Sequence, residues 1–238
     1  FQHYADDQYF IDPCKLLLTT PGIDMQTGEY EATGIPAAIL AHYLRESSVI
    51  PEKADLNSIL FLLTPAETLA KFQHLVARIV SFEKHIRENS PVTQVLPTLA
   101  KAYPQYRKLT INELCQLMHN FYAKHQLNKR QKQMFEREHR PKVAMSAFDA
   151  HNAFIRNEVE LVSLHDIKGR IAMEGALPYP PGVYCIVPGE VWDGAVLDYF
   201  LALQEGVNRL PGFEPEVQGV YWEYDENGRK IAYAYVLK

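Results

Sequence analysis

The chain has 238 residues, of which 47% are hydrophobic and 22% are charged. This length and composition exclude a disordered chain and allow one large domain or two small ones. The net charge of −5 and the sequence pI near 6.0 give no electrostatic reason to expect a nucleic acid or an anionic membrane as a partner.

The three cysteines, Cys14, Cys115 and Cys185, are few, odd in number and far apart. They exclude a disulfide framework and a Cys-x-x-Cys zinc site, and we expect reduced, mostly buried thiols in a cytoplasmic protein. No apolar run approaches about 18 residues, so no membrane-spanning helix is predicted. The start, Phe1–Asp7, has neither an initiator Met nor signal-peptide features, which indicates a piece cut from a longer protein.

The first 90 residues predict a small α/β layer domain. Buried strands are expected at 15–20 and 58–63, with a helix at 35–45 between them. The sequence Thr64-Pro65-Ala66-Glu67 combines a capping box with a proline at the first helical position, and it predicts the start of a second helix. An apolar stripe at helical spacing is expected to form the buried face of that helix: Leu69, Phe72, Val76, Ile79 and Ile86.

Residues 91–160 predict mostly helix, with helix starts at Thr110–Glu113 and Ser146–Asp149. From Glu158 the pattern changes to short strands. A helix is expected over 193–210. A hairpin with strands at 220–224 and 230–237 follows, turning around Asn227-Gly228. The fold class is therefore α/β and α+β, with a domain boundary near 89–91.

Motifs for nucleotide binding, for serine hydrolases and for zinc do not occur in the sequence: there is no Gly-x-Gly-x-x-Gly, Gly-x-x-x-x-Gly-Lys or Gly-x-Ser-x-Gly. Ser81-Phe82-Glu83-Lys84 matches Ser-x-x-Lys, but it lies in a helical pattern and is interpreted as a solvated face. The nine histidines show no ligand spacing, so no metal site is predicted. The residues by themselves leave the function open.

Several stretches resemble the bacterial ornithine/lysine/arginine decarboxylases, which are fold-type I PLP enzymes. The strongest is Gly169–Glu190, with Glu174-Gly175-Ala176-Leu177-Pro178-Tyr179-Pro180-Pro181-Gly182-Val183. The others lie at 12–24, 34–37, 49–67, 156–162 and 210–213. The resemblance covers nearly the whole chain, with the motifs in the order typical of the family.

Pro51-Glu52-Lys53-Ala54-Asp55-Leu56-Asn57-Ser58 is similar to the ornithine members, which typically read Pro-Glu-Lys-x-Asp-Leu-Asn-Ser. Lysine members typically carry Glu-Lys-Thr-Gly-Pro-Tyr, and arginine members replace the Glu-Lys pair. The resemblance implies the carboxy-terminal part of a decarboxylase that converts ornithine to putrescine and CO2. The alternatives are a stand-alone, non-catalytic binding or regulatory module and the tail of a lysine or arginine decarboxylase.

The resemblance further implies a small aminotransferase-like α/β domain at 1–90 and a mixed α+β carboxy-terminal domain at 91–238. The family's PLP lysine follows Ser-x-His-Lys in a large domain, and no Ser-x-His-Lys occurs in this sequence. No catalytic residue is therefore assigned. Pyridoxal 5'-phosphate, the electron sink of such enzymes, is expected in the parent enzyme but not on this piece, which should be inactive alone. The parent is expected to be a homodimer or a ring of dimers.

Two residues are candidates for the active site. The resemblance implies that Glu52 faces the distal amino group of the substrate, because an ammonium entering a partly dry pocket needs a charged acceptor. The alternative is a solvent-facing glutamate that pairs with Lys53. Tyr179, in the proline-rich segment 177–182, either lines the active-site entrance or belongs to a structural elbow between strands.

Overall fold

The computed structural model describes residues 12–179 and 182–238, which pack into two compact units. The first unit comprises the chain up to Asp24 together with Glu29–His119, and the second comprises Met25–Gly28 and Asn120–Lys238. The division falls inside helix α5 (Ile111–His125). It is a division of packing, and the domain limits 1–90 and 91–238 remain a prediction.

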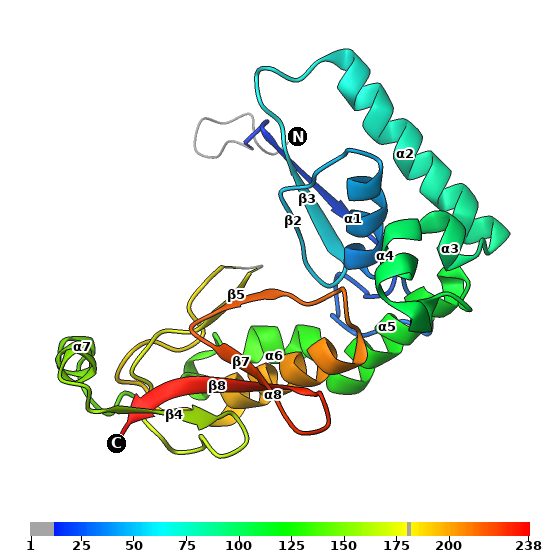
Figure 1. Cartoon of the computed structure of the whole chain (residues 1–238). Coiled ribbons are helices and arrows are strands. Elements are labelled where there is room, and N and C mark those ends of the chain that lie inside the picture. Colours follow the sequence, from blue (N-terminus) through cyan, green and yellow to red (C-terminus); the bar gives the residue numbers. More distant parts are fainter. Residues whose placement is uncertain (1–11, 180–181) are drawn as a thin grey trace. The chain divides into compact units, whose positions relative to one another are not determined.

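The first unit is built on a three-stranded antiparallel sheet. Its order is β1 (Lys15–Thr19), β3 (Ser58–Leu62) and β2 (Lys53–Ala54). Helix α1 (Ala37–Glu46) lies beside this sheet (Figure 1). Both predicted strands and the first predicted helix are therefore confirmed, and Pro36 stands at the N-cap position, just before the first helical residue, without a side-chain cap.

The strands of this sheet bury one face only. Ile59 and Phe61 of β3 are buried, whereas Leu62 is 45% exposed and Leu17 of β1 is 59% exposed. Successive side chains of a strand point to opposite faces of the sheet. In the described residues, other apolar side chains cover only one of these two faces. The prediction of buried strands is therefore confirmed for Ile59 and Phe61 of β3 only, because the side chains of β1 are exposed or half-buried.

Helix α2 (Leu69–Glu88) begins four residues after the predicted start. Thr64 and Glu67 do interact, since the Thr64 hydroxyl donates to the Glu67 carboxylate at 3.3 Å, but they close a turn. The cap is Thr68, whose side chain accepts from the backbone N–H of Lys71. A second threonine thus supplies the N-cap that α-helices prefer.

The predicted buried stripe of α2 is wrong in most of its members. Leu69 is 74% and Val76 is 59% exposed, and Phe72 is 36% exposed. The buried residues of this helix are Leu75 and Phe82, and the Phe82 ring packs on that of Tyr43 in α1, with 5.2 Å between centroids. The helix carries apolar residues on more than one face, and the contact with α1 determines which of them is buried.

After α2, the rest of the first unit is mostly helical, as predicted. The segments are α3 (Val92–Val95), α4 (Pro97–Ala102), a 3-10 turn (Pro104–Tyr106) and the start of α5. The capping box that precedes α5 is confirmed. The Glu113 carboxylate accepts from the backbone N–H of Thr110 at 2.8 Å, and the Thr110 hydroxyl lies 3.4 Å from the Glu113 N–H.

The second unit is built on a sheet with the order β4 (Val159–Ser163), β8 (Lys230–Leu237) and β7 (Tyr221–Tyr224), all antiparallel. The predicted terminal hairpin is thereby confirmed. Helix α8 (Gly194–Arg209) packs on β8, and its predicted start is confirmed by the Asp193 cap. A separate pair of short strands, β5 (Leu177–Tyr179) and β6 (Glu216–Gln218), carries the proline-rich motif.

The remaining elements of this unit are α6 (Leu127–Gln133), a 3-10 turn (Arg137–His139) and α7 (Ala147–Ile155). Ser146 caps α7 by accepting from the Asp149 N–H, as its sequence predicts. None of the helices in the described parts of the chain combines the length and the apolar character needed to cross a membrane.

The contact between α1 and α2 generates a stability prediction. Phe82→Ala should lower the free energy of unfolding by about 3–5 kcal/mol, because it leaves a cavity beside Tyr43. Val76→Ala, on the exposed face of the same helix, should change it by less than about 0.5 kcal/mol. Urea unfolding of both variants, followed by circular dichroism, measures the difference. Equal losses in the two variants would contradict the burial of Phe82 and the exposure of Val76.

Candidate functional site

Glu52 lies between the end of α1 and the short strand β2, at the open end of the β2–β3 hairpin. Its backbone N–H donates to the carbonyl of Leu60 at 2.8 Å. Pro51 before it is buried, whereas the Glu52 side chain is exposed. The backbone is thus fixed by the hairpin while the carboxylate faces outward.

The carboxylate of Glu52 makes no hydrogen bond or ion pair with any other residue in the described ranges. In particular, it does not pair with Lys53, as the alternative interpretation requires. An unpaired carboxylate on a fixed backbone can accept a charge-assisted hydrogen bond from an ammonium group. The geometry is compatible with substrate binding, and the role of Glu52 stays a prediction.

A groove of about 600 Å³ lies in the same unit. Its lining is mainly apolar and comes from 48–50, 61–63, Glu67, 70–72 and 74–75 of the chain. The charged side chains of this lining, Glu67 and Lys71, already form an ion pair of 3.1 Å, and His74 bonds the carbonyl of Ser47. Glu52 is not among the lining residues, so the groove offers no unpaired acid or base.

Tyr179 ends strand β5 opposite Glu216 and is 39% exposed. Its ring lies over Gly182, where a side-chain carbon would come within 2.7 Å of it. Gly182 has a φ of +76°, and its N–H donates to the carbonyl of Pro178 at 2.9 Å. This left-handed φ favours glycine at position 182. Pro180 and Pro181 lie outside the described residues, and the entrance role of Tyr179 stays a prediction.

A polar pocket of about 340 Å³ in the second unit was not predicted from the sequence. Its lining residues come from α5, α6, α8, the segment after β4 and the β7–β8 turn. Because they are far apart in the sequence, no local motif predicts this pocket. Burial lowers the pKa of His125, which lies 3.4 Å from the Glu205 carboxylate. That carboxylate is held by Arg209 at 2.7 Å. The pocket thus holds an imidazole whose pKa is lowered by burial, beside a carboxylate that is already paired with Arg209.

The predicted burial of most cysteines is confirmed: Cys115 and Cys185 are buried, and Cys14 is partly buried. Burial raises the pKa of Cys115 and that of Cys185 to about 12. Because a thiolate is the reactive form, neither buried thiol is suited to nucleophilic catalysis. Hydrogen bonding to Glu174 similarly raises the pKa of Tyr221 to about 12, which makes its hydroxyl a donor and not a base.

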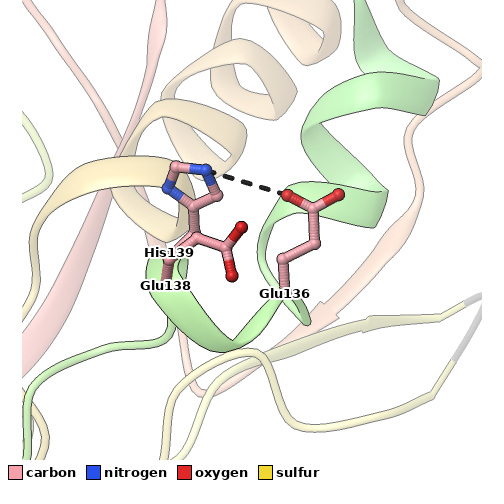
Figure 2. Close-up of side chains that lie close together, drawn as sticks. All are labelled: Glu136, Glu138 and His139. Carbon is pink, nitrogen blue, oxygen red and sulfur yellow. Dashed lines mark ion pairs between the residues drawn. The ribbon is translucent and has the colours of Figure 1, made fainter.

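One group of side chains in the described residues meets the distance requirement of a metal site: Glu136, Glu138 and His139 (Figure 2). All three are exposed and come from one turn of chain. His139 lies 3.7 Å from the Glu136 carboxylate, and two arginines, Arg137 and Arg140, belong to the same turn. Nothing else points to a cation here, so no metal site is assigned.

None of the lysines in the described part of this chain is suited to bind PLP covalently. The lysine that binds this cofactor needs a desolvated surrounding that lowers its pKa, and none of the lysines in the described ranges is buried. Because the lysines are not buried and Ser-x-His-Lys is missing, no described residue is assigned to covalent cofactor binding.

Two family models match the chain. The model for "Orn/Lys/Arg decarboxylase, major domain" matches residues 1–71, and that for "Orn/Lys/Arg decarboxylase, C-terminal domain" matches residues 128–238.

Curated relatives match over the full length of the chain. It is 61% identical to the constitutive ornithine decarboxylase of Escherichia coli strain K12, over 100% of the chain and 34% of the relative. It is 58% identical to the ornithine decarboxylase of Haemophilus influenzae, over 100% of the chain and 33% of the relative. The chain thus spans about a third of the length of these relatives.

Solved structures agree with the fold. The constitutive lysine decarboxylase of E. coli matches with a TM-score of 0.87 and 33% identity, over 96% of this chain and 32% of the other. Lysine decarboxylase A of Pseudomonas aeruginosa matches with a TM-score of 0.87 and 34% identity, over 96% of this chain and 30% of the other. The predicted α/β and α+β fold class is confirmed.

The burial of two cysteines generates a prediction about thiol reactivity. At pH 8, Ellman's reagent should label Cys14 quickly and Cys115 and Cys185 only slowly, since burial blocks access and keeps their thiols protonated. Time-resolved labelling of the wild type and of Cys14→Ser tests this. A fast phase that survives in Cys14→Ser would contradict it.

Proposed function

Because this chain belongs to the Orn/Lys/Arg decarboxylase family, we propose that the protein of which it forms a part decarboxylates ornithine to putrescine and CO2. The observation that supports this substrate is a difference in identity. The chain is 58–61% identical to three ornithine decarboxylases, but 34% identical to a lysine decarboxylase and 31% identical to an arginine decarboxylase. A lysine or arginine decarboxylase tail is therefore disfavoured.

The contribution of this chain would be to bind substrate and to shape its pocket. The Glu52 carboxylate would accept a hydrogen bond from the distal ammonium of ornithine. The distance from this carboxylate to the reacting carbon would then select the chain length of the substrate. Two features support the assignment: the carboxylate is unpaired in the described residues, and its backbone is bonded to β3. PLP would be held by residues outside this chain, so this piece should be inactive alone.

The organisation of the parent protein is part of the proposal. Residues 1–90 would form a small aminotransferase-like domain and 91–238 the carboxy-terminal domain of a cytoplasmic homodimer or ring of dimers. A stand-alone binding or regulatory module gains no specific support, because both family models describe domains of decarboxylases. No nucleic-acid partner is proposed for a chain with a net charge of −5.

The full-length protein with PLP tests the role of Glu52. Glu52→Gln should raise the KM for ornithine roughly 10- to 100-fold, the value of one charge-assisted hydrogen bond, with a smaller change in kcat. Steady-state assays of CO2 release measure both constants.

Glu83→Gln is the matched control, because Glu83 is an exposed glutamate on α2. It should leave KM and kcat at the wild-type values. An unchanged KM in Glu52→Gln would remove Glu52 from the substrate site.

A second experiment separates the two interpretations of Tyr179. If the ring lines the entrance, Tyr179→Ala should lower kcat/KM for ornithine about tenfold at an unchanged melting temperature, since a misplaced substrate costs rate. Tyr224→Ala, at a 70% exposed tyrosine of the same unit, should change neither. A lower melting temperature with unchanged kcat/KM would support the structural elbow.

A further inference from the structure

The side chain of Asn57 occupies the polar centre of the first unit. It is 6% exposed and lies at the turn between β2 and β3. Its amide nitrogen is 2.8 Å from the carbonyl of Pro21, 3.3 Å from that of Ile35 and 3.3 Å from the hydroxyl of Thr20. An amide has two N–H donors, so these acceptors share them and converge on one nitrogen.

Backbone hydrogen bonds repeat the connections that Asn57 makes. The Thr20 N–H donates to the Asn57 carbonyl at 2.9 Å, and the Ala37 N–H donates to the Leu56 carbonyl at 3.0 Å. The Ile35 N–H donates to the Pro21 carbonyl at 2.8 Å. The end of β1, the segment before α1 and the hairpin turn are thus fixed to one another.

Glu52 belongs to the same hairpin as Asn57. The hairpin is closed by the bonds from Glu52 N–H to Leu60 carbonyl and from Asp55 N–H to Ser58 carbonyl, both 2.8 Å. Strand β2 has two residues, so few ladder bonds hold it. A tilt of the turn would therefore move the carboxylate of Glu52 relative to β1 and α1.

The space around the Asn57 amide leaves little freedom for another side chain. A side-chain carbon at Gly22 would lie 3.0 Å from this nitrogen and 2.8 Å from the Cα of Gly34. The backbone at Gly22 therefore passes very close both to the Asn57 amide and to the backbone at Gly34. The amide oxygen is buried and has no hydrogen-bond partner, which costs free energy. The N–H donors of Asn57 therefore hold the turn in place, although the burial of its unpaired amide oxygen is unfavourable.

We propose that Asn57 is a positioning residue for Glu52, and that it thereby sets the discrimination between ornithine and lysine, the diamino acid that is one methylene longer. This inference rests on the proposed function. Asn57 itself does not touch the substrate. It holds the hairpin that carries the carboxylate, and a misplaced carboxylate would bind the shorter and the longer ammonium with similar strength.

The test uses Asn57→Asp in the full-length protein with PLP. The change keeps the size of the side chain but replaces the donor with an oxygen that faces carbonyl groups. We expect kcat/KM for ornithine divided by kcat/KM for lysine to fall about tenfold, within the range that one methylene supports. The loss should appear as a higher KM for ornithine, with a smaller change in kcat.

Gln204→Glu is the matched control. Gln204 is 4% exposed in the second unit, where its amide oxygen accepts from the Ala232 N–H and its nitrogen lies 2.7 Å from His165. It therefore undergoes the same amide-to-carboxylate change at similar burial. It should lower the melting temperature and leave the ornithine-to-lysine ratio at the wild-type value.

A lower melting temperature of Asn57→Asp with an unchanged ratio would overturn the inference, because it would show a structural role alone. If this variant does not fold, Asn57→Ala, which removes the donors without adding a charge, is measured in the same way, and an unchanged ratio there overturns the inference too. If Glu52→Gln also leaves KM unchanged, the proposed substrate contact fails. If Glu52→Gln raises KM and the Asn57 variants keep the ratio, only the inference about Asn57 fails.

Discussion

A buried carboxamide that joins backbone segments far apart in the sequence is the interaction on which each unit depends. In the first unit the amide of Asn57 connects β1, the segment before α1 and the β2–β3 turn. In the second unit Gln204 of α8 connects the helix to β8 through the Ala232 N–H. Short sheets bury few side chains, so a directional bond at their centre fixes what apolar packing alone would leave loose.

The sheet of the first unit shows how little of its surface is covered within the chain. One face of β3 is buried and the same face of β1 is half-buried, while Leu17 and Leu62 on the other face remain exposed. Helix α2 repeats this arrangement, with Leu75 and Phe82 inside and a second apolar row outside. Since burial of apolar area is what stabilises a fold, the apolar core of this unit comes mainly from α1, β3 and the helices that follow α2, and α2 adds only Leu75 and Phe82.

In the proposed function, this chain would contribute substrate binding and the rest of the parent protein would hold the cofactor. The hairpin would carry Glu52 as the binding group, since the Glu52 backbone N–H is bonded to the carbonyl of Leu60. Bond breaking in this family depends on a cofactor, and the described lysines are exposed or half-exposed. The pKa of each buried thiol and that of Tyr221 are raised, so these groups are protonated and do not act as bases or nucleophiles at neutral pH.

The sequence by itself determined the elements whose signals are local. The cap at Thr110, the start of α8 at Asp193 and the turn at Gly228 each follow from a few neighbouring residues. The family, too, followed from motifs in the sequence. Glu52 and Tyr179 were candidates through those motifs alone, and their roles remain predictions.

Only the tertiary structure decided which apolar residues are buried and which polar groups meet. The stripe predicted for α2 failed because several faces of the helix are apolar, and the partner helix selects among them. The convergence of Thr20, Pro21 and Ile35 on Asn57 has no local signal, since these residues are 22 to 37 positions away from it. Periodicity and capping describe neighbours along the chain, whereas burial and long-range hydrogen bonds depend on how the elements pack.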